Sequence, residues 1–164
     1  MSRLSKADAS WFLEKMQKVQ AFSVLSNSEL MHLISQMRNY EFKSGTTLVN
    51  QGESANLFFI VHEGLVEVSV KKFLFRNKKV ALLKSGSFFG ESVLVSNSKR
   101  TATVKALTDT SCYVLLKPSF RFMLQENPLF KESLRTVFSR RKLQLRNAWY
   151  LLTHVRYVGV RLRE

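Results

Sequence analysis

The chain has 164 residues, 45% of them hydrophobic and 23% charged, which is the composition of a globular domain and excludes disordered and low-complexity classes. Lys and Arg number 26 against 12 Asp and Glu, and the net charge of +14 predicts attraction to polyanions. The single cysteine, Cys112, excludes an intrachain disulfide. We find no apolar run of membrane-spanning length and no signal-peptide pattern, and we expect a cytoplasmic protein.

A helical segment is expected over residues 1–39. Its first helix, over residues 8–20, places four apolar residues on one face: Trp11, Phe12, Met16 and Val19. Ser26 and Glu29 form a capping-box pattern, and the apolar spacing that follows predicts a second helix over residues 27–37.

The pattern changes over residues 40–118, where short apolar runs alternate with turn residues. The sequence predicts strands at residues 46–49, 57–61, 66–70, 80–83, 101–106 and 111–116. Evenly spaced short strands indicate a β-sandwich or barrel of roughly eight strands rather than a parallel α/β sheet.

Helical patterns return over residues 119–164. We expect a short helix over residues 119–127 and a second helix that begins at Pro128 and reaches about residue 153. The last residues, Val155 to Glu164, show no helical period. Positive charge is concentrated in two stretches, residues 71–84 and 138–164.

The loop that carries the most chemical information covers residues 89–104. Gly90 permits a tight turn, and residues 91–94 can form one helical turn whose N–H groups would bind a phosphate. Arg100 follows nine residues after Glu91 and can reach the same anion, whereas Glu91 needs neutral hydroxyl donors, as a ribose supplies. The loop therefore suits a phosphorylated sugar, and a solvated surface loop is an equal alternative.

The same loop resembles the phosphate-binding cassette of the cyclic-nucleotide-binding domain family. The family includes the catabolite activator protein and the regulatory subunits of cAMP-dependent protein kinase. The resemblance extends over about residues 12–146 and includes further stretches: residues 22–26, Gln51-Gly52-Glu53, residues 58–68, residues 83–91, and Phe120 with Asn127-Pro128. One departure is Ala55-Asn56, where many members have Gly-Asp.

This resemblance implies a mainly β fold with flanking helices, namely a double-stranded β-helix (jelly-roll) barrel with C-terminal hinge helices. It implies that Glu91 accepts from the ribose 2′-hydroxyl and that Arg100 pairs with the cyclic phosphate. The turn after Gly90 would hold the phosphate through the backbone amides of Ser92 and Val93. Thr101 would touch the phosphate or the purine.

The resemblance implies cAMP or cGMP as the ligand. A Thr101 hydroxyl could bind a guanine amino group, yet relatives with Thr here also take cAMP, and we favour cAMP as the commoner ligand of the family. The lid over the base would come from the C-terminal helix, with Leu134, Val137 and Phe138 as candidates. For each of these three, ordinary core packing is the favoured interpretation.

No catalytic motif competes with this interpretation, so we expect no enzyme and no cofactor. His32, His62 and His154 lack the spacing of metal ligands. Cys112 lies in an apolar strand, which predicts a buried, inert thiol.

Seventeen residues follow Asn147, too few for a helix-turn-helix, and we expect a single-domain sensor without specific DNA binding. The moving part would be the C-terminal helix, and its basic segment would dock an acidic protein partner. Trp149, Tyr150 and Tyr157 slightly favour such a contact, and they could equally pack on the domain or form a homodimer. The alternatives are a scaffold protein without ligand, a solvated helix face, and nucleic-acid binding through the basic tail.

Overall fold

The structure is a computed structural model that describes residues 4–71, 77–94 and 99–158, with side chains up to residue 147 in the last range. Several predictions lie outside this part of the chain. They concern Lys72 and Arg76 in the basic stretch, residues 95–98 of the cassette, the side chains of Trp149, Tyr150 and Tyr157, and residues 159–164.

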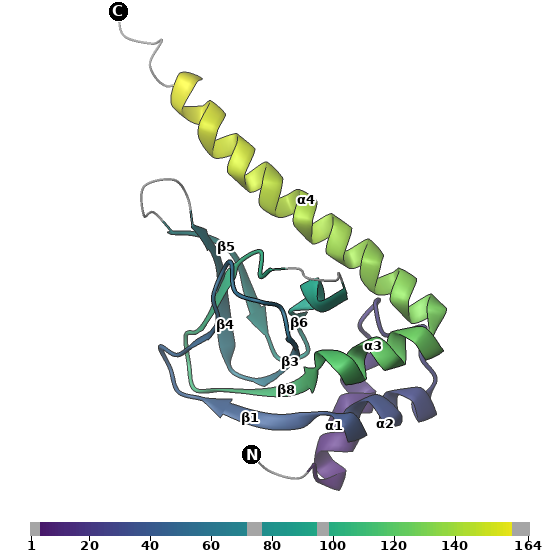
Figure 1. Ribbon diagram of the computed structural model, residues 1–164. Helices are drawn as coiled ribbons and strands as arrows, with labels where there is room; N and C mark the ends of the chain where they lie inside the picture. Colours follow the sequence, from purple (N-terminus) through teal and green to yellow (C-terminus); the bar gives the residue numbers. More distant parts are fainter. Residues whose placement is uncertain (1–3, 72–76, 95–98, 159–164) are drawn as a thin grey trace, which may run out of the picture.

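Two antiparallel four-stranded sheets face each other and confirm the mainly β, jelly-roll fold (Figure 1). The first sheet has the order β1 (Arg38–Phe42), β8 (Thr110–Leu116), β3 (Leu57–Glu63) and β6 (Phe88–Phe89). The second has the order β2 (Thr47–Val49), β7 (Thr103–Ala106), β4 (Leu65–Lys71) and β5 (Asn77–Lys84). The strands form two sheets and not one closed barrel.

Two strands were not predicted, β1 and β6. The alternating polar and aromatic residues of β1 form a weak strand signal, and β6 has only two residues, so tertiary pairing decides both. The predicted strand over residues 101–106 is also shorter, because β7 begins at Thr103 and leaves Thr101 outside the ladder.

Four helices flank the sandwich, α1 (Lys6–Met16), α2 (Asn27–Gln36), α3 (Lys117–Glu126) and α4 (Pro128–Val158). The predicted capping box at Ser26 and Glu29 is present and opens α2. The first helix ends at Met16 and not near residue 20. After Met16 the backbone hydrogen bonds join residues i and i+3, as in Val19 N–H to the Met16 carbonyl, and the chain forms turns in place of the α-helix.

The long helix α4 begins at Pro128 as predicted, but it continues to Val158 (Figure 1). The expectation of a non-helical segment from Val155 was therefore wrong for residues 155–158. Neither Gly nor Pro interrupts the sequence between Pro128 and Gly159, so local propensity sustains the helix without an apolar period. Within the described residues, every helix is too short or too polar to cross a bilayer.

Hydrophobic residues form two cores. The first joins the helices to the outer face of the first sheet, and it includes Phe12, Phe22, Phe58, Phe120 and Phe130. The second fills the space between the two sheets, and it includes Phe59, Val61, Phe89, Cys112 and Val114. Adjacent residues Phe58 and Phe59 thus point into different cores, as the alternation of a strand requires.

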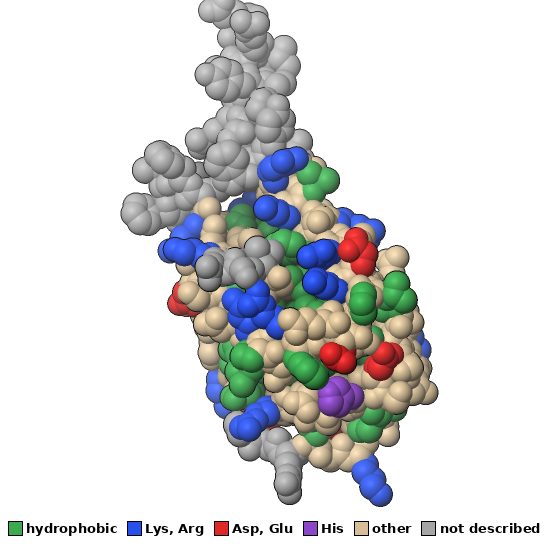
Figure 2. Space-filling model, turned by 45° about the vertical axis from the view of Figure 1, so that its right-hand side comes forward, with side chains coloured by type: hydrophobic (Ala, Val, Ile, Leu, Met, Phe, Trp, Pro, Cys, Tyr) green, Lys and Arg blue, Asp and Glu red, His purple; other side chains and the backbone are tan. Residues whose placement is uncertain are grey.

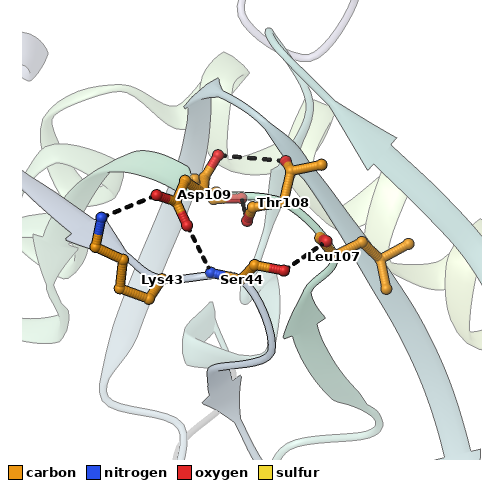
Figure 3. A network of polar contacts seen from close by, with 6 residues as sticks. Lys43, Ser44, Leu107, Thr108 and Asp109 are labelled. Carbon is orange, nitrogen blue, oxygen red and sulfur yellow. Dashed lines mark hydrogen bonds and ion pairs between the residues drawn. The ribbon is translucent and has the colours of Figure 1, made fainter.

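Polar contacts fix two turns at one end of the sandwich (Figure 3). Asp109 accepts from the Lys43 ammonium at 2.9 Å and from the Ser44 backbone N–H at 2.9 Å. The Ser44 hydroxyl in turn donates to the Leu107 carbonyl at 2.8 Å. These bonds join the turn before β2 to the turn between β7 and β8.

Candidate functional site

A cavity of about 290 Å³ lies between the sandwich and α4. Strands β4, β5 and β7 supply an apolar wall that includes Val68, Leu83 and Val104. The 3₁₀ turn η1 (Glu91–Leu94) and the residues around Arg100 supply the polar wall. Helix α4 closes the cavity with five residues: Phe138, Arg141, Lys142, Gln144 and Leu145.

Gly90 sets the direction in which η1 leaves β6. Its φ of +90° lies in the region that favours glycine. A Cβ atom at this position would lie 2.7 Å from the Leu57 carbonyl oxygen and 2.8 Å from Arg100 Nη1. The backbone of Gly90 therefore packs directly against the arginine of the cavity, with no room for a side chain.

Arg100 is 6% exposed and is positioned through both its backbone and its side chain. Its backbone N–H donates to the Glu53 carbonyl at 2.8 Å, and its carbonyl accepts from the Gly52 N–H at 2.9 Å. In the side chain, Nη2 donates to the Leu57 carbonyl at 2.8 Å. The other terminal nitrogen, Nη1, is buried without a hydrogen-bond partner among the described residues.

A buried guanidinium nitrogen without a partner is costly, so it marks a place where an acceptor is expected. Burial lowers the pKa of Arg100, while the carboxylates of Glu91 and Glu53 raise it. Because an arginine begins from so high a pKa, the side chain keeps its charge at neutral pH. The cavity therefore offers a cation that can bind an anionic group.

Glu91 lies at the start of η1, is 8% exposed and is bound by α4. Its Oε1 accepts from Arg141 Nη1 at 3.0 Å, and the same nitrogen donates to the Phe88 carbonyl at 2.8 Å. The Arg141 guanidinium also lies over the Phe88 ring, 4.4 Å from its centre. Three contacts thus attach α4 to the strand and turn that carry Glu91.

Five of the six predicted site residues line the cavity, namely Gly90, Glu91, Ser92, Arg100 and Thr101. The sixth, Val93, does not, because its side chain is fully buried in the helical core. Its N–H donates to the Gly90 carbonyl at 3.1 Å within the turn. A phosphate contact from the Val93 amide therefore requires that this bond open or be shared.

The candidate lid residues are divided between two environments. Leu134 is buried in the helical core and Val137 packs against it, in agreement with ordinary core packing. Phe138 instead lines the cavity, so it is the one candidate of the three placed to cover a ligand.

Sequence reasoning missed the role of Arg141. It placed this residue in the basic segment that would contact a partner, whereas the structure pairs it with Glu91 inside the cavity. Arg141 lies three residues after Phe138, and this helical spacing on one face is the signal that could have identified it.

The other candidate groups of the sequence were the possible metal ligands and Cys112. Within residues 4–71, 77–94 and 99–147, no group of three His, Cys, Asp or Glu side chains is placed to hold a metal ion. Cys112 is buried between the sheets, and burial raises the pKa of its thiol to about 12, which makes it an inert core residue.

Comparison with known proteins matches residues 40–127, more than half of the chain, to the family model for the cyclic nucleotide-binding domain. A cGMP-dependent protein kinase of Plasmodium berghei is 36% identical over 104 residues, which are 63% of this chain and 12% of the kinase. A cAMP-dependent protein kinase regulatory subunit of Candida albicans is 32% identical over 110 residues, 67% of this chain and 23% of the subunit. The chain thus spans less than a quarter of the length of these two relatives.

Solved structures share the fold. The cAMP-bound PfPKA-R structure has a TM-score of 0.70 and 25% identity, over 74% of this chain and 43% of that one. The catabolite activator protein of Thermus thermophilus has a TM-score of 0.72 and 23% identity, over 82% of this chain and 63% of that one. The family model that matches this chain describes a binding domain. The chain belongs to the cyclic nucleotide-binding domain family.

Proposed function

We propose that this chain binds a 3′,5′-cyclic nucleotide as a non-catalytic sensor, and that the ligand moves α4. The observation that carries the proposal is the buried Arg100 Nη1, which has no hydrogen-bond partner among the described residues, beside the cavity carboxylate of Glu91. In this role Arg100 pairs with the cyclic phosphate and Glu91 accepts from the ribose 2′-hydroxyl. Gly90 and Ser92 approach the phosphate at the turn, and Thr101 contacts the phosphate or the base.

The apolar wall of β4, β5 and β7 suits the flat base, which Phe138 would cover from α4. We propose cAMP as the ligand and cGMP as the alternative. Thr101 is exposed at the cavity and could donate to guanine or to the phosphate, so it favours neither base. The relatives include kinases named for cGMP and regulatory subunits named for cAMP.

The experiment is a thermal unfolding series of the full chain with cAMP, cGMP, AMP and guanosine, each in excess. A ligand at about 100 times its dissociation constant stabilises the fold by roughly 2.7 kcal/mol, which for a chain of this size is a shift of roughly 5–10 °C. A shift with one or both cyclic nucleotides and none with AMP supports the proposal. An equal shift with guanosine, which has no phosphate, would show that Arg100 is not the anchor.

The output of the sensor would pass through Arg141. This residue binds Glu91, the group that we propose for the ribose, so ligand entry changes the contacts that attach α4 to the sandwich. The helix also carries exposed basic residues that do not line the cavity, among them Arg140 and Arg146. In Figure 2, Lys and Arg side chains outnumber acidic ones across the upper half of the face shown.

We propose that this basic surface docks an acidic protein partner in a ligand-dependent manner. Partner capture should increase with the nucleotide present and decrease when Arg140 and Arg146 are replaced by Glu. Capture that is equal with and without nucleotide would contradict the proposal.

The net charge of +14 favours a second candidate, polyanion binding. A titration with duplex DNA at increasing salt distinguishes the two. Binding to DNA would weaken steeply with salt and would not respond to the cyclic nucleotide.

A further inference from the structure

A second cavity, of about 360 Å³, opens between the two sheets and shares no lining residue with the first. Phe59 lines this second cavity, and its ring stacks on that of Phe89, which lines the first cavity, with the ring centres 4.5 Å apart. This aromatic pair therefore separates the two cavities. Ligand pockets in proteins typically have volumes of roughly 300–1,000 Å³, so the second cavity is large enough for a small molecule.

Strand register explains why the wall of this cavity is apolar. Leu57 pairs with Leu116 and Phe59 pairs with Val114, across β3 and β8. Paired residues in an antiparallel ladder share one face, so all four side chains point between the sheets. Phe42 and Leu48 add to the same wall. A sugar or another strongly polar molecule would find few partners there.

The polar groups lie on one side, at the junction of α2 and β1. Gln36 and Arg38 are exposed and line the cavity, and Tyr40 is 39% exposed beside them. Arg38 pairs with Val114 in the ladder, so its stem begins on the apolar face. A guanidinium carries five N–H donors, so it can bind a carboxylate in addition to the contacts that it makes within the chain. The cavity thus joins an apolar interior to a cationic rim.

We propose that this second cavity binds an amphiphilic carboxylate of the medium-chain fatty-acid class. The hydrocarbon chain lies against Leu57, Phe59 and Val114, and the carboxylate pairs with Arg38. This binding uses residues outside the nucleotide site, so it does not depend on the proposed function.

The test is isothermal titration calorimetry of the full chain with sodium decanoate below its micelle concentration. We expect one site per chain. Leu116→Glu places a negative charge at the mouth and should weaken binding about tenfold or more, while Leu82→Glu on β5 is the matched control. Leu116 is 61% exposed and Leu82 is 60% exposed, so both variants should fold.

A second pair tests the head group. Arg38→Gln should weaken decanoate binding about tenfold, whereas Arg140→Gln on α4 should not. Decanol, which lacks the charge, should bind to the original chain more weakly than decanoate does. The affinity for decanol should be the same in the original chain and in Arg38→Gln.

Three results would overturn the proposal. They are no decanoate binding, equal binding by Leu116→Glu and Leu82→Glu, or decanol binding as tight as decanoate binding. If a variant does not fold, the binding site is located instead by methyl NMR of the original chain. Decanoate should then shift the signals of Leu48, Leu57 and Val114, and shifts confined to other methyl groups would place the ligand elsewhere.

Discussion

At the scale of single residues, Arg100 has an unusual division of contacts. One terminal nitrogen donates to a backbone carbonyl, and the other is buried without a partner among the described residues. The Phe59 ring lies 5.8 Å from the guanidinium carbon, so an aromatic face also limits where the side chain can move. The residue is therefore held in place before any anion arrives, which lowers the entropic cost of binding one.

Arg100→Ala should reduce the affinity for the cyclic nucleotide by about 30- to 1000-fold. The change removes a charge-assisted pair worth on the order of 2–4 kcal/mol. Calorimetric titration measures the loss, and Arg135→Ala, at an exposed position of α4 outside the cavity, is the control. Equal affinity of Arg100→Ala and the original chain would remove Arg100 from the site.

Gly90→Ala should weaken both the fold and the site. The positive φ costs an L-residue roughly 1–2 kcal/mol, and the new methyl group would meet Arg100 Nη1 and the Leu57 carbonyl. We expect a lower midpoint of urea unfolding and a lower nucleotide affinity. Gly45→Ala is the control, since its φ of +87° carries the same strain but nothing lies within 4 Å of a Cβ there. If both variants lose affinity equally, the close packing at Gly90 has no role in binding.

At the scale of elements, α1 is attached to the sandwich through Asp8 and Tyr113. The Tyr113 hydroxyl donates to Asp8 Oδ1 at 2.7 Å, and the ring of Tyr113 is fully buried. Asp8 is also the N3 residue of the capping box whose N-cap is Ser5. One carboxylate thus stabilises the start of the helix and its contact with β8.

This contact predicts a pH dependence of stability. Burial raises the pKa of Asp8, but the hydrogen bonds from Tyr113 and Ser5 outweigh it and bring the pKa below the ordinary 3.8. A group with a lowered folded-state pKa stabilises the fold fully above its unfolded-state pKa and loses this effect as pH falls through the folded-state value. The stabilisation from Asp8 should therefore be complete above about pH 4 and decline below it.

Urea unfolding of the original chain and of Asp8→Asn at pH 7 and at pH 2–3 measures this effect. The difference in unfolding free energy should shrink at the lower pH. The pKa of Asp109 is lowered too, by its bond with Lys43, but that carboxylate is present in both proteins and cancels in the comparison. A difference that does not change with pH would show that Asp8 acts only through packing.

At the scale of the whole molecule, α4 is both a wall of the cavity and the longest element of the chain (Figure 1). Near its start, α4 packs into the helical core through Phe130 and Leu134. At the cavity, Arg141 of α4 contacts Glu91, the Phe88 carbonyl and the Phe88 ring. These contacts are the route by which we propose that a change at the carboxylate reaches the helix.

The cyclic nucleotide should change the position of α4 relative to the sandwich. Spin labels at Asn147→Cys and Glu41→Cys, both exposed positions, report this distance by electron–electron resonance, because the buried Cys112 does not compete for label. We expect a new distance distribution with nucleotide, and no change in the same pair carrying Arg100→Ala.

Arg141→Gln in the labelled chain tests the link itself. Without its charge the helix should lose its bond to Glu91, and the distribution should broaden before any nucleotide is added. A distribution identical to that of the parent pair would show that the link does not hold α4.

The sequence by itself determined the order of the helices and of six strands, the capping box at Ser26 and Glu29, and the turn of Glu91–Leu94. These features depend on residues a few positions apart, whose propensities and spacing act locally. The approach of Gly90, Glu91 and Arg100 to one cavity was also predictable, because a short loop joins them and the family resemblance assigns their roles.

Only the tertiary structure decided which residues complete the site. Arg141 meets Glu91 across fifty residues of sequence, and its spacing from Phe138 does not distinguish it from Lys142, which lies four residues after Phe138 on the same face. The same holds for the short strand β6 and for the cavity at Arg38, which exist because distant segments pair or pack. Contacts of this kind join residues that are far apart in the sequence, so they depend on the tertiary fold. The periodicity of apolar residues along the sequence predicts single elements, but it does not predict which distant elements meet.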